Sequence, residues 1–468
     1  MKTRYFLISI LMAMFLVLTV ALPSGLAGKK SQDIQNLFDG DEAFSQIEAL
    51  CDLGPRVAGS SAEKDAADYI ATEMESYGLE VEIQEFDIIY FEELSDPELE
   101  QVSPYLTVYQ VDTDFATMDY SGSGDVTASL QAVDLDMPPT SNSTSGCEAA
   151  DFDSFIPGNI ALIQRGTCYY SDKAMNAEDA GAVGVIIFNE GNTPGRIPLM
   201  YGTLGGPGID IPVQSGSFTL GEDLYNLTLA GDVTVRMFVD TITEERTSQN
   251  VIGTLEGTHP DQGIVYIGGH YDSVSGAPGA NDDASGVAAT LEVARVLSTK
   301  GHRTKATLKF IAFGAEEIGL DGSYLYVDEN FDEVTTMGLG MVNLDMIGVG
   351  DTLQIGNVSD SDALEDYTGE KASAMGMTWE SFTAGANSDH YYFEVVGVPV
   401  VFLTQDPDPY YHTPEDDLDK IQVDTLEANG ELATAAMYDW AKNPVLRAKK
   451  AAKLEKVHVR HDRVLTTE

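Results

Sequence analysis

Residues 264–297 read IVYIGGHYDSVSGAPGANDDASGVAATLEVARVL and set the pattern for the C-terminal half of the chain. The unbroken apolar run over 264–268 predicts a strand buried on both faces, as is usual in a parallel sheet. A glycine-rich loop follows, and apolar residues then recur at helical spacing over 287–297. The segment is typical of a strand, a loop and a helix that covers the sheet.

Outward from this segment the alternation of strand and helix continues. Apolar runs predict further strands over 308–313, 340–346 and 400–403. Such a pattern is typical of an α/β fold, so we expect a mixed, mostly parallel sheet flanked by helices on both faces. In sheets of this kind the chemistry gathers at the carboxyl ends of the strands.

A helix is expected upstream, at residues 60–78. Ser60 and Glu63 have the spacing of a capping box, and Gly78 is typical of a helix stop. Apolar residues alternate over 79–83, so a strand should follow the helix directly.

The composition of the chain changes between about residues 105 and 243. Charged residues become fewer, and stretches rich in Ser, Thr, Gly and Pro divide this part into short strands, which indicates an inserted, smaller β-rich α+β domain. We therefore expect a signal peptide at 1–27, the first part of the main domain at 28–105, the insertion at 106–244, the second part of the main domain at 245–445 and a basic tail at 446–468.

The composition is that of a folded but strongly acidic protein. Hydrophobic residues make up 43% of the chain and charged residues 22%. Asp plus Glu number 76 against 26 Lys plus Arg, a formal net charge of −50, which argues against binding to nucleic acids. The same excess suits a saline setting, where salt screens the charges, but a merely acidic secreted protein is equally compatible with it.

The N-terminus predicts export. A basic start precedes an apolar stretch over 5–22 and a small-x-small pattern at 25–27, as in a secretory signal peptide. We therefore expect an extracellular or periplasmic protein without stable membrane contact, unless the segment stays uncleaved as an anchor. Outside the cell Cys147 and Cys168 could form a disulfide, whereas the apolar surroundings of Cys51 indicate a buried thiol.

Five predicted strand ends or adjoining loops each deliver a side chain that can bind metal. A mixed nitrogen and oxygen set suits zinc, and five ligands are too many for one tetrahedral ion but right for two ions that share a carboxylate. Taken singly, each motif could equally be a polar strand end, a helix cap or a solvated loop. A one-zinc endoprotease is disfavoured because His-Glu-x-x-His is absent from the sequence. The candidate ligands are His270, Asp282, Glu317, Asp345 and His412.

The motifs also occur in a familiar order. In sequence they are His270-x-Asp272, Gly279-Ala280-Asn281-Asp282-Asp283-x-Ser285-Gly286, Glu316-Glu317-x-Gly319, Asn343-Leu344-Asp345, Ser388-Asp389-His390 and Tyr411-His412-Thr413. They resemble the motifs of the di-zinc exopeptidase family that includes aminopeptidase Y and glutamate carboxypeptidase. The resemblance covers roughly residues 35–105 and 245–445. A second family of di-zinc peptidases and deacylases shares the first and third motifs, but its Gly-Arg-Gly-x-x-Asp loop is not matched here.

The insertion has a resemblance of its own. Residues 159–189, which begin Asn-Ile-Ala-Leu-Ile-Gln-Arg-Gly-Thr-Cys, are similar to a protease-associated (PA) domain. In the exopeptidase family this module is commonly inserted ahead of the catalytic motifs, as it would be here.

The resemblance implies a role for each matching residue. Asp282 would bridge two zinc ions, with His270 and Asp345 completing one site and Glu317 and His412 the other. Asp272 would hold the imidazole of His270 in the correct tautomer. Glu316 would be the general base, and Tyr411 would donate a hydrogen bond to the oxyanion. Asp389 and His390 match positions near the pocket, without a role that we can assign.

The function implied is that of a secreted zinc-dependent exopeptidase that attacks the peptide bond with metal-activated water. An aminopeptidase acting on the N-termini of peptides or proteins fits best, because the sequence shows no basic cluster near the motifs to bind a C-terminal carboxylate. A carboxypeptidase of the same family is the alternative, since Arg165, Arg196 or Lys420 could serve, and a non-catalytic receptor or adhesion relative is a third. The oligomeric state is left open.

Overall fold

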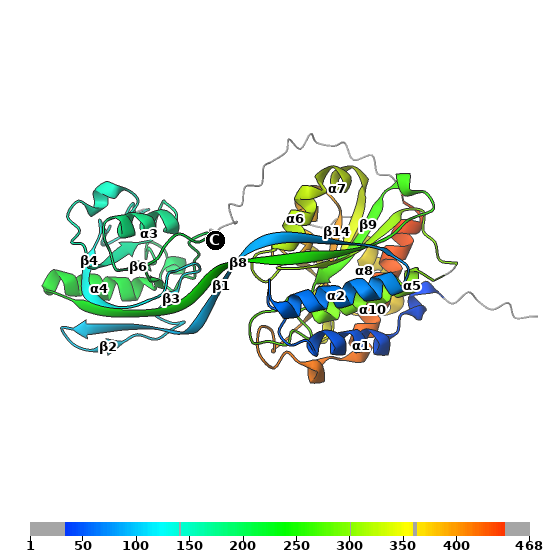
Figure 1. Ribbon diagram of the computed structural model, residues 1–468, viewed down its shortest axis with the longest axis horizontal. Helices are drawn as coiled ribbons and strands as arrows, with labels where there is room; N and C mark the ends of the chain where they lie inside the picture. The colour runs from blue at the N-terminus through cyan, green and yellow to red at the C-terminus, as the bar shows by residue number, and fades with distance from the viewer. Residues whose placement is uncertain (1–32, 140–141, 300, 359–362, 445–468) are drawn as a thin grey trace, which may run out of the picture.

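The computed structural model describes residues 33–139, 142–299, 301–358 and 363–444. The expected signal peptide and basic tail lie outside these residues. Two α/β bodies sit at the two ends of a long two-stranded ribbon (Figure 1). In the part of the chain that is described, no helix combines the length and the apolarity needed to cross a membrane.

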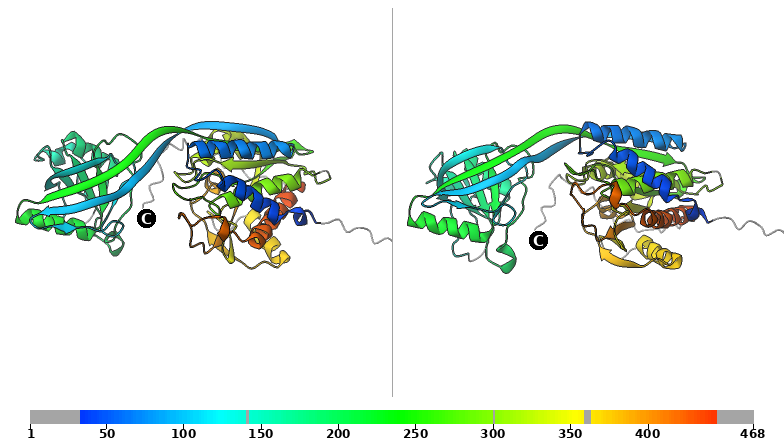
Figure 2. Two further views of the ribbon diagram at one scale, coloured as in Figure 1. Left: turned by 60° about the horizontal axis from the view of Figure 1, so that its bottom comes forward. Right: turned by 90° about the horizontal axis from the view of Figure 1, so that it is seen from below.

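The ribbon consists of β1 (Glu80–Ser103) and β8 (Thr234–Leu255), which pair antiparallel along their length. It leaves the sheet of the larger body and enters the sheet of the smaller one, as both views of Figure 2 show. Residues 244 and 245, where we expect the insertion to end, both lie inside β8. The change of domain is thus carried by continuous strands.

The larger body is built on a mixed, mostly parallel sheet, as predicted. Its strand order is β13-β12-β14-β11-β9-β10-β8. The central four strands β10, β9, β11 and β14 run parallel, whereas β8 and β12 each pair antiparallel with this group. The strands are β9 (Ile264–His270), β10 (Thr307–Phe313), β11 (Gly338–Leu344), β12 (Thr352–Asn357), β13 (Trp379–Thr383) and β14 (Val400–Asp406).

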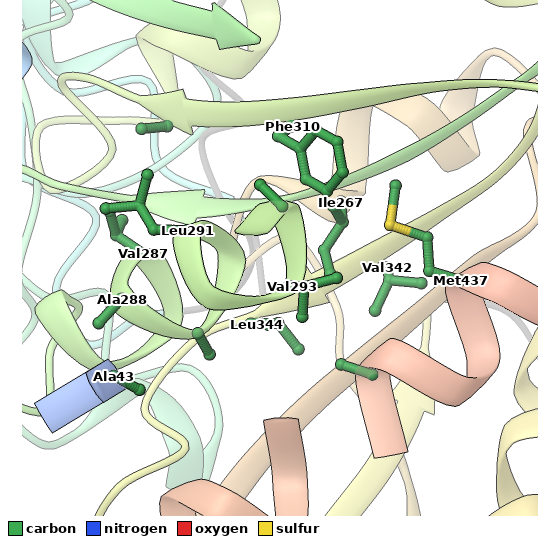
Figure 3. Close-up of a cluster of buried hydrophobic side chains, with 14 of the residues drawn as sticks. Ala43, Ile267, Val287, Ala288, Leu291, Val293, Phe310, Val342, Leu344 and Met437 are labelled. Carbon is green, nitrogen blue, oxygen red and sulfur yellow. The ribbon is translucent and has the colours of Figure 1, made fainter. Parts of the chain in front are cut away.

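Helices cover both faces of this sheet (Figures 1 and 2). One face carries α1 (Gly40–Cys51), α2 (Ser61–Ser76), α5 (Ala284–Leu297), α8 (Ala363–Met375) and α10 (Val423–Lys442). The other carries α6 (Asp321–Glu329), α7 (Phe331–Met337) and α9 (His390–Val395). Strand β9 alternates between them: Val265 and Ile267 enter the first layer, Ile264 and Tyr266 the second. Figure 3 shows part of the first layer, where Val293 of α5 lies beside Ile267 and Leu291 lies beside Val287.

Helix α2 begins as predicted, but its capping box is only half formed. The Ser60 hydroxyl accepts the Glu63 N–H at 3.1 Å. The Glu63 carboxylate does not return to the Ser60 N–H; it accepts instead from the Gly59 N–H and from the Ser248 hydroxyl, each at 2.6 Å. The buried Ser248 of β8 offers Glu63 a hydroxyl partner that no local sequence pattern could reveal.

The smaller body extends the same hydrogen-bonded sheet through β8. Strands β4 to β7 are parallel, β3 is antiparallel to β7, and two hydrophobic clusters lie on the two faces of this sheet. The elements are β2 (Thr107–Val108), β3 (Phe115–Thr117), β4 (Gly124–Ala132), β5 (Ile160–Gln164), α3 (Tyr170–Asp179), β6 (Gly184–Phe188), β7 (Val213–Gly216) and α4 (Phe218–Ala230).

Cys147 and Cys168 form the predicted disulfide, and Cys51 of the larger body is partly buried, which raises the pKa of its thiol to about 11.

Candidate metal centre

The five predicted ligands meet at one edge of the main sheet. His270 ends β9, Glu317 follows β10, Asp345 follows β11 and His412 lies beyond β14, while Asp282 comes from the loop between β9 and α5. Because the four strands are parallel neighbours, their carboxyl ends are brought together.

Asp282 lies between the two histidines. Its Oδ1 is 3.1 Å from Nε2 of His270, and its Oδ2 is 3.3 Å from Nε2 of His412. Asp345 Oδ1 lies 3.7 Å from the His270 nitrogen, and Glu317 Oε2 lies 3.0 Å from the His412 nitrogen. The five side chains thus form two groups of three that share one carboxylate.

These separations fit two bound cations. Two ligands about 2.0–2.1 Å from one tetrahedral zinc ion stand roughly 3.3 Å apart, and the observed values of 3.0–3.7 Å bracket that distance. Glu317 Oε1 and Asp345 Oδ1 are buried without a hydrogen-bond partner among the described residues. Over the same residues no lysine or arginine forms an ion pair with Asp282, Glu317 or Asp345. Buried carboxylates need compensating positive charge, and divalent cations would supply it.

The ligands perturb one another strongly. Burial lowers the pKa of His412, but hydrogen bonds with Asp282 and Glu317 outweigh it and raise this pKa to about 10. Burial raises the pKa of Glu317 to about 7, and the charge of Asp282 adds to the rise. Burial also raises the pKa of Asp282, yet hydrogen bonds from both histidines bring it below its usual range. The centre therefore concentrates negative charge around two imidazoles.

Glu316 stands beside these groups without joining either. Its Oε2 is 4.0 Å from Nε2 of His270, and its side chain is 11% exposed. Burial raises the pKa of Glu316 well above its usual range; His270 lowers it, while Asp389 and other neighbouring carboxylates raise it further. A carboxylate in this position can exchange a proton with a molecule held at the centre.

Asp272 lies behind His270 and also holds Glu316 and Glu317. Its Oδ1 is 3.5 Å from Nδ1 of His270, while its own carbonyl oxygen is closer, at 3.2 Å. The two carboxylate oxygens accept the N–H groups of Glu316, at 3.0 Å, and Glu317, at 3.2 Å. Asp272 thereby ties the end of β9 to the turn that follows β10.

Tyr411 is half exposed and covers His412. Their rings are stacked, with centroids 3.7 Å apart. Burial raises the pKa of the Tyr411 phenol, and the carboxylates of Asp282 and Glu317 raise it further, so the hydroxyl keeps its proton and can act as a donor.

Asp389 and His390 are buried behind the centre. His390 stacks on Phe402 with ring centroids 4.8 Å apart, and burial lowers its pKa to about 4. Burial raises the pKa of Asp389 to about 7. The residue of this motif that touches a ligand is Ser388, whose hydroxyl donates to Asp345 Oδ2 at 2.7 Å.

The helix cap that an aspartate of this loop could supply is made by Asp283. Its Oδ1 accepts the Gly286 N–H at 2.8 Å and the Met346 N–H at 3.0 Å, so it caps α5 and holds the residue after Asp345. One of its oxygens also lies within 4.8 Å of ligand atoms of His270 and Asp345. Asp282 and Asp283 therefore have different roles: Asp283 caps α5, and the Asp282 side chain is free to face the two histidines.

Comparisons with known proteins agree with this architecture. The model of peptidase family M28 matches residues 250–437, and that of the PA domain matches residues 126–224. Aminopeptidase YwaD of Bacillus subtilis is 37% identical over 420 residues, which cover 86% of each chain. The chain belongs to peptidase family M28. The family resemblance and the inserted PA domain are thereby confirmed.

Solved structures extend the likeness of this M28 peptidase to nearly the full length of its relatives. An aminopeptidase from Aneurinibacillus sp. strain AM-1 superposes with a TM-score of 0.70 at 34% identity, covering 88% of this chain and 96% of that one. BSAP, a zinc aminopeptidase from Bacillus subtilis, gives a TM-score of 0.60 at 32% identity, with 88% and 97% covered.

Proposed function

We propose that this M28 peptidase is an aminopeptidase that holds two zinc ions and removes N-terminal residues from peptides. The observation that carries the proposal is the position of Asp282, with one oxygen 3.1 Å from His270 and the other 3.3 Å from His412. A carboxylate so placed can bridge two cations. The relatives named above, which are aminopeptidases and in one case a zinc aminopeptidase, support the reaction class.

The reaction divides among the residues around the centre. Bound there, zinc ions would lower the pKa of a water molecule and polarise the scissile carbonyl. Glu316 takes the proton of the attacking water and returns it to the leaving amine. Asp272 holds Glu316 through its backbone N–H. Tyr411, over His412, donates a hydrogen bond to the oxygen that gains negative charge.

Charge around the centre favours a substrate with a free amine. Lys420 lies 5.1 Å from the ring of Tyr410, next to the Tyr411–His412 turn, and it already pairs with Asp419 at 2.7 Å. Arg165 follows β5 and Arg196 ends the short 3-10 helix η3 (Pro194–Arg196), so both belong to the inserted domain. The acidic surroundings suit an ammonium group better than a C-terminal carboxylate.

Three versions of one peptide separate the exopeptidase alternatives. An aminopeptidase should cleave the unblocked and C-amidated peptides and leave the N-acetylated peptide intact. Cleavage that survives acetylation and is lost on amidation would instead establish a carboxypeptidase.

A chromogenic aminoacyl amide tests for catalysis itself. We expect hydrolysis that stops with a chelator and returns with zinc. Absence of both zinc and turnover would indicate the receptor or adhesion alternative.

We also propose that the protein is exported, because of the signal-like pattern at 1–27, and the Cys147–Cys168 disulfide is consistent with an oxidising compartment. N-terminal sequencing of protein from the producing cells should find a mature chain that begins near residue 28. An intact Met1 would contradict cleavage.

A further inference from the structure

The segment between β9 and α5, residues 271–283, has no regular secondary structure. We call it the metal loop because it carries Asp282. Most of its residues are buried, including Tyr271, Asp272 and Asn281 to Asp283. Buried N–H and C=O groups outside helices and sheets need other hydrogen-bond partners, so the partners of this loop decide its conformation.

Its carbonyl groups are held by Arg56, which lies between α1 and α2. The side chain is fully buried, with 0% of its surface exposed. The guanidinium donates to the carbonyls of Tyr271 at 2.6 Å, Pro278 at 2.6 Å and Gly279 at 2.8 Å. The Arg56 N–H also donates to the Ser273 hydroxyl at 3.0 Å. The Arg56 side chain therefore joins Tyr271, at the start of the loop, to Pro278 and Gly279 near its middle.

Its N–H groups near Asp282 are held by Asp416, which is 1% exposed. One carboxylate oxygen accepts the Asn281 N–H at 2.8 Å, and the other accepts the Asp282 N–H at 3.1 Å. The Asp416 carbonyl accepts the Ala280 N–H at 3.3 Å. Three successive N–H groups of the loop thus end on one residue.

Asp416 belongs to the same turn as His412. A second link joins that turn to the loop, because the Asn281 side chain donates to Asp408 Oδ2 at 2.8 Å. The same side chain accepts the N–H of Gly348, between β11 and β12, at 2.8 Å. The backbone that carries Asp282 is therefore tied directly to the backbone that carries the second histidine.

We propose that Arg56 and Asp416 are positioning residues that hold the metal loop through complementary backbone groups, so that Asp282 faces His270 and His412 together. The inference rests on the proposed two-metal function. Asp282 must serve two histidines that lie on different segments, and a displacement of about 1 Å would cost one of the two contacts. Among the described residues, neither Arg56 nor Asp416 forms a hydrogen bond or ion pair with a ligand side chain, so both act through the loop.

The deciding variant is Asp416→Asn, because an amide offers one acceptor to two N–H groups. The matched control is Asp417→Asn, an exposed neighbour whose carboxylate accepts the Leu418 N–H at 2.7 Å, at the start of the short helix η5 (Leu418–Lys420). Each metal-free protein is titrated with Co²⁺, and visible absorption follows coordination geometry, which a general loss of stability would not alter. We expect the wild type and the control to bind two equivalents with the same spectrum. Asp416→Asn should bind roughly 10- to 100-fold more weakly with an altered spectrum.

A second arm replaces Arg56 by Lys, which cannot donate to three carbonyls from a rigid fork. Arg303→Lys is its control, since Arg303 is exposed and donates to the Glu256 carbonyl. We expect Arg56→Lys to weaken Co²⁺ binding and Arg303→Lys to leave it unchanged.

Two results would overturn the inference. In the first, the wild type binds two equivalents of Co²⁺ and hydrolyses substrate, and Asp416→Asn binds Co²⁺ with the same affinity and spectrum. This result would refute the positioning role and leave the proposed function standing. In the second, the wild type binds no Co²⁺ and hydrolyses no peptide, which would refute both the positioning role and the proposed function.

Discussion

A single carboxylate, Asp282, faces both histidines of the centre, and the loop that carries it is held by Arg56 and Asp416. The ligands were recognisable because each stands at the end of a predicted strand or in the adjoining loop. Arg56 and Asp416 gave no such signal, because they bind backbone atoms of residues 223 and 135 positions away. The prediction of a complete capping box at Ser60 and Glu63 was wrong for the same reason, because the Glu63 carboxylate binds the distant Ser248 hydroxyl instead.

Replacing Glu316 by Gln tests the general base. We expect kcat to fall about 100- to 10,000-fold because the amide cannot accept the water proton. Zinc content should stay at the wild-type level, since Glu316 belongs to neither ligand group. The exposed Glu415→Gln variant is the control, and activity in Glu316→Gln above a tenth of the wild type would exclude the assigned role.

Glu63 should make stability depend on pH. Burial raises the pKa of Glu63 to about 8, and the charge of Asp272 contributes. Between pH 4.5 and 8 the folded state holds a proton that the unfolded state releases, so the free energy of unfolding should fall as pH rises through this window and level off above it. The fall amounts to about 4 kcal/mol.

Denaturant unfolding of Glu63→Gln at pH 5, 7 and 9 checks this expectation. The variant should lose that part of the pH dependence and exceed the wild type in stability at pH 9. Parallel pH profiles for the two proteins would contradict it.

Among the elements, helix α5 was predicted from the helical spacing of its apolar residues. The sequence did not predict how closely α5 approaches the sheet. A Cβ on Gly286 would lie 2.1 Å from the Leu344 carbonyl oxygen, so the first turn of α5 packs directly on the end of β11. The ribbon was missed as well, since Asp96 and Pro97 interrupt the strand pattern. The chain accommodates them where the register shifts between Ser95 and Glu98.

Gly286→Ala should therefore destabilise the larger body by about 1–3 kcal/mol, because the new methyl group overlaps the backbone of β11. Gly195→Ala is the matched control, because its Cβ would meet no atom within 4 Å. Denaturant unfolding measures both variants. Equal stability of the Gly286→Ala variant and the wild type would contradict the close packing.

The whole molecule carries a net charge of −50, so its folded state works against self-repulsion. Salt screens such repulsion, and Tm should rise with NaCl between 0.1 M and about 1 M, where the screening length falls to about 3 Å. For a chain of this size, each kcal/mol of relieved repulsion adds roughly 1–2 °C to Tm. Sucrose at equal osmolality controls for solute exclusion, and a Tm that stays level in NaCl would show that the charges are already compensated.

The central claim is a pair of cations that share Asp282. Zinc content per chain after exhaustive dialysis of zinc-loaded protein, measured by mass spectrometry of the metal, tests it most directly. We expect two zinc ions in the wild type and a marked loss in Asp282→Ala, because both ligand groups lose their shared member. A wild type that retains no zinc, or an Asp282→Ala variant that keeps two ions, would contradict the account.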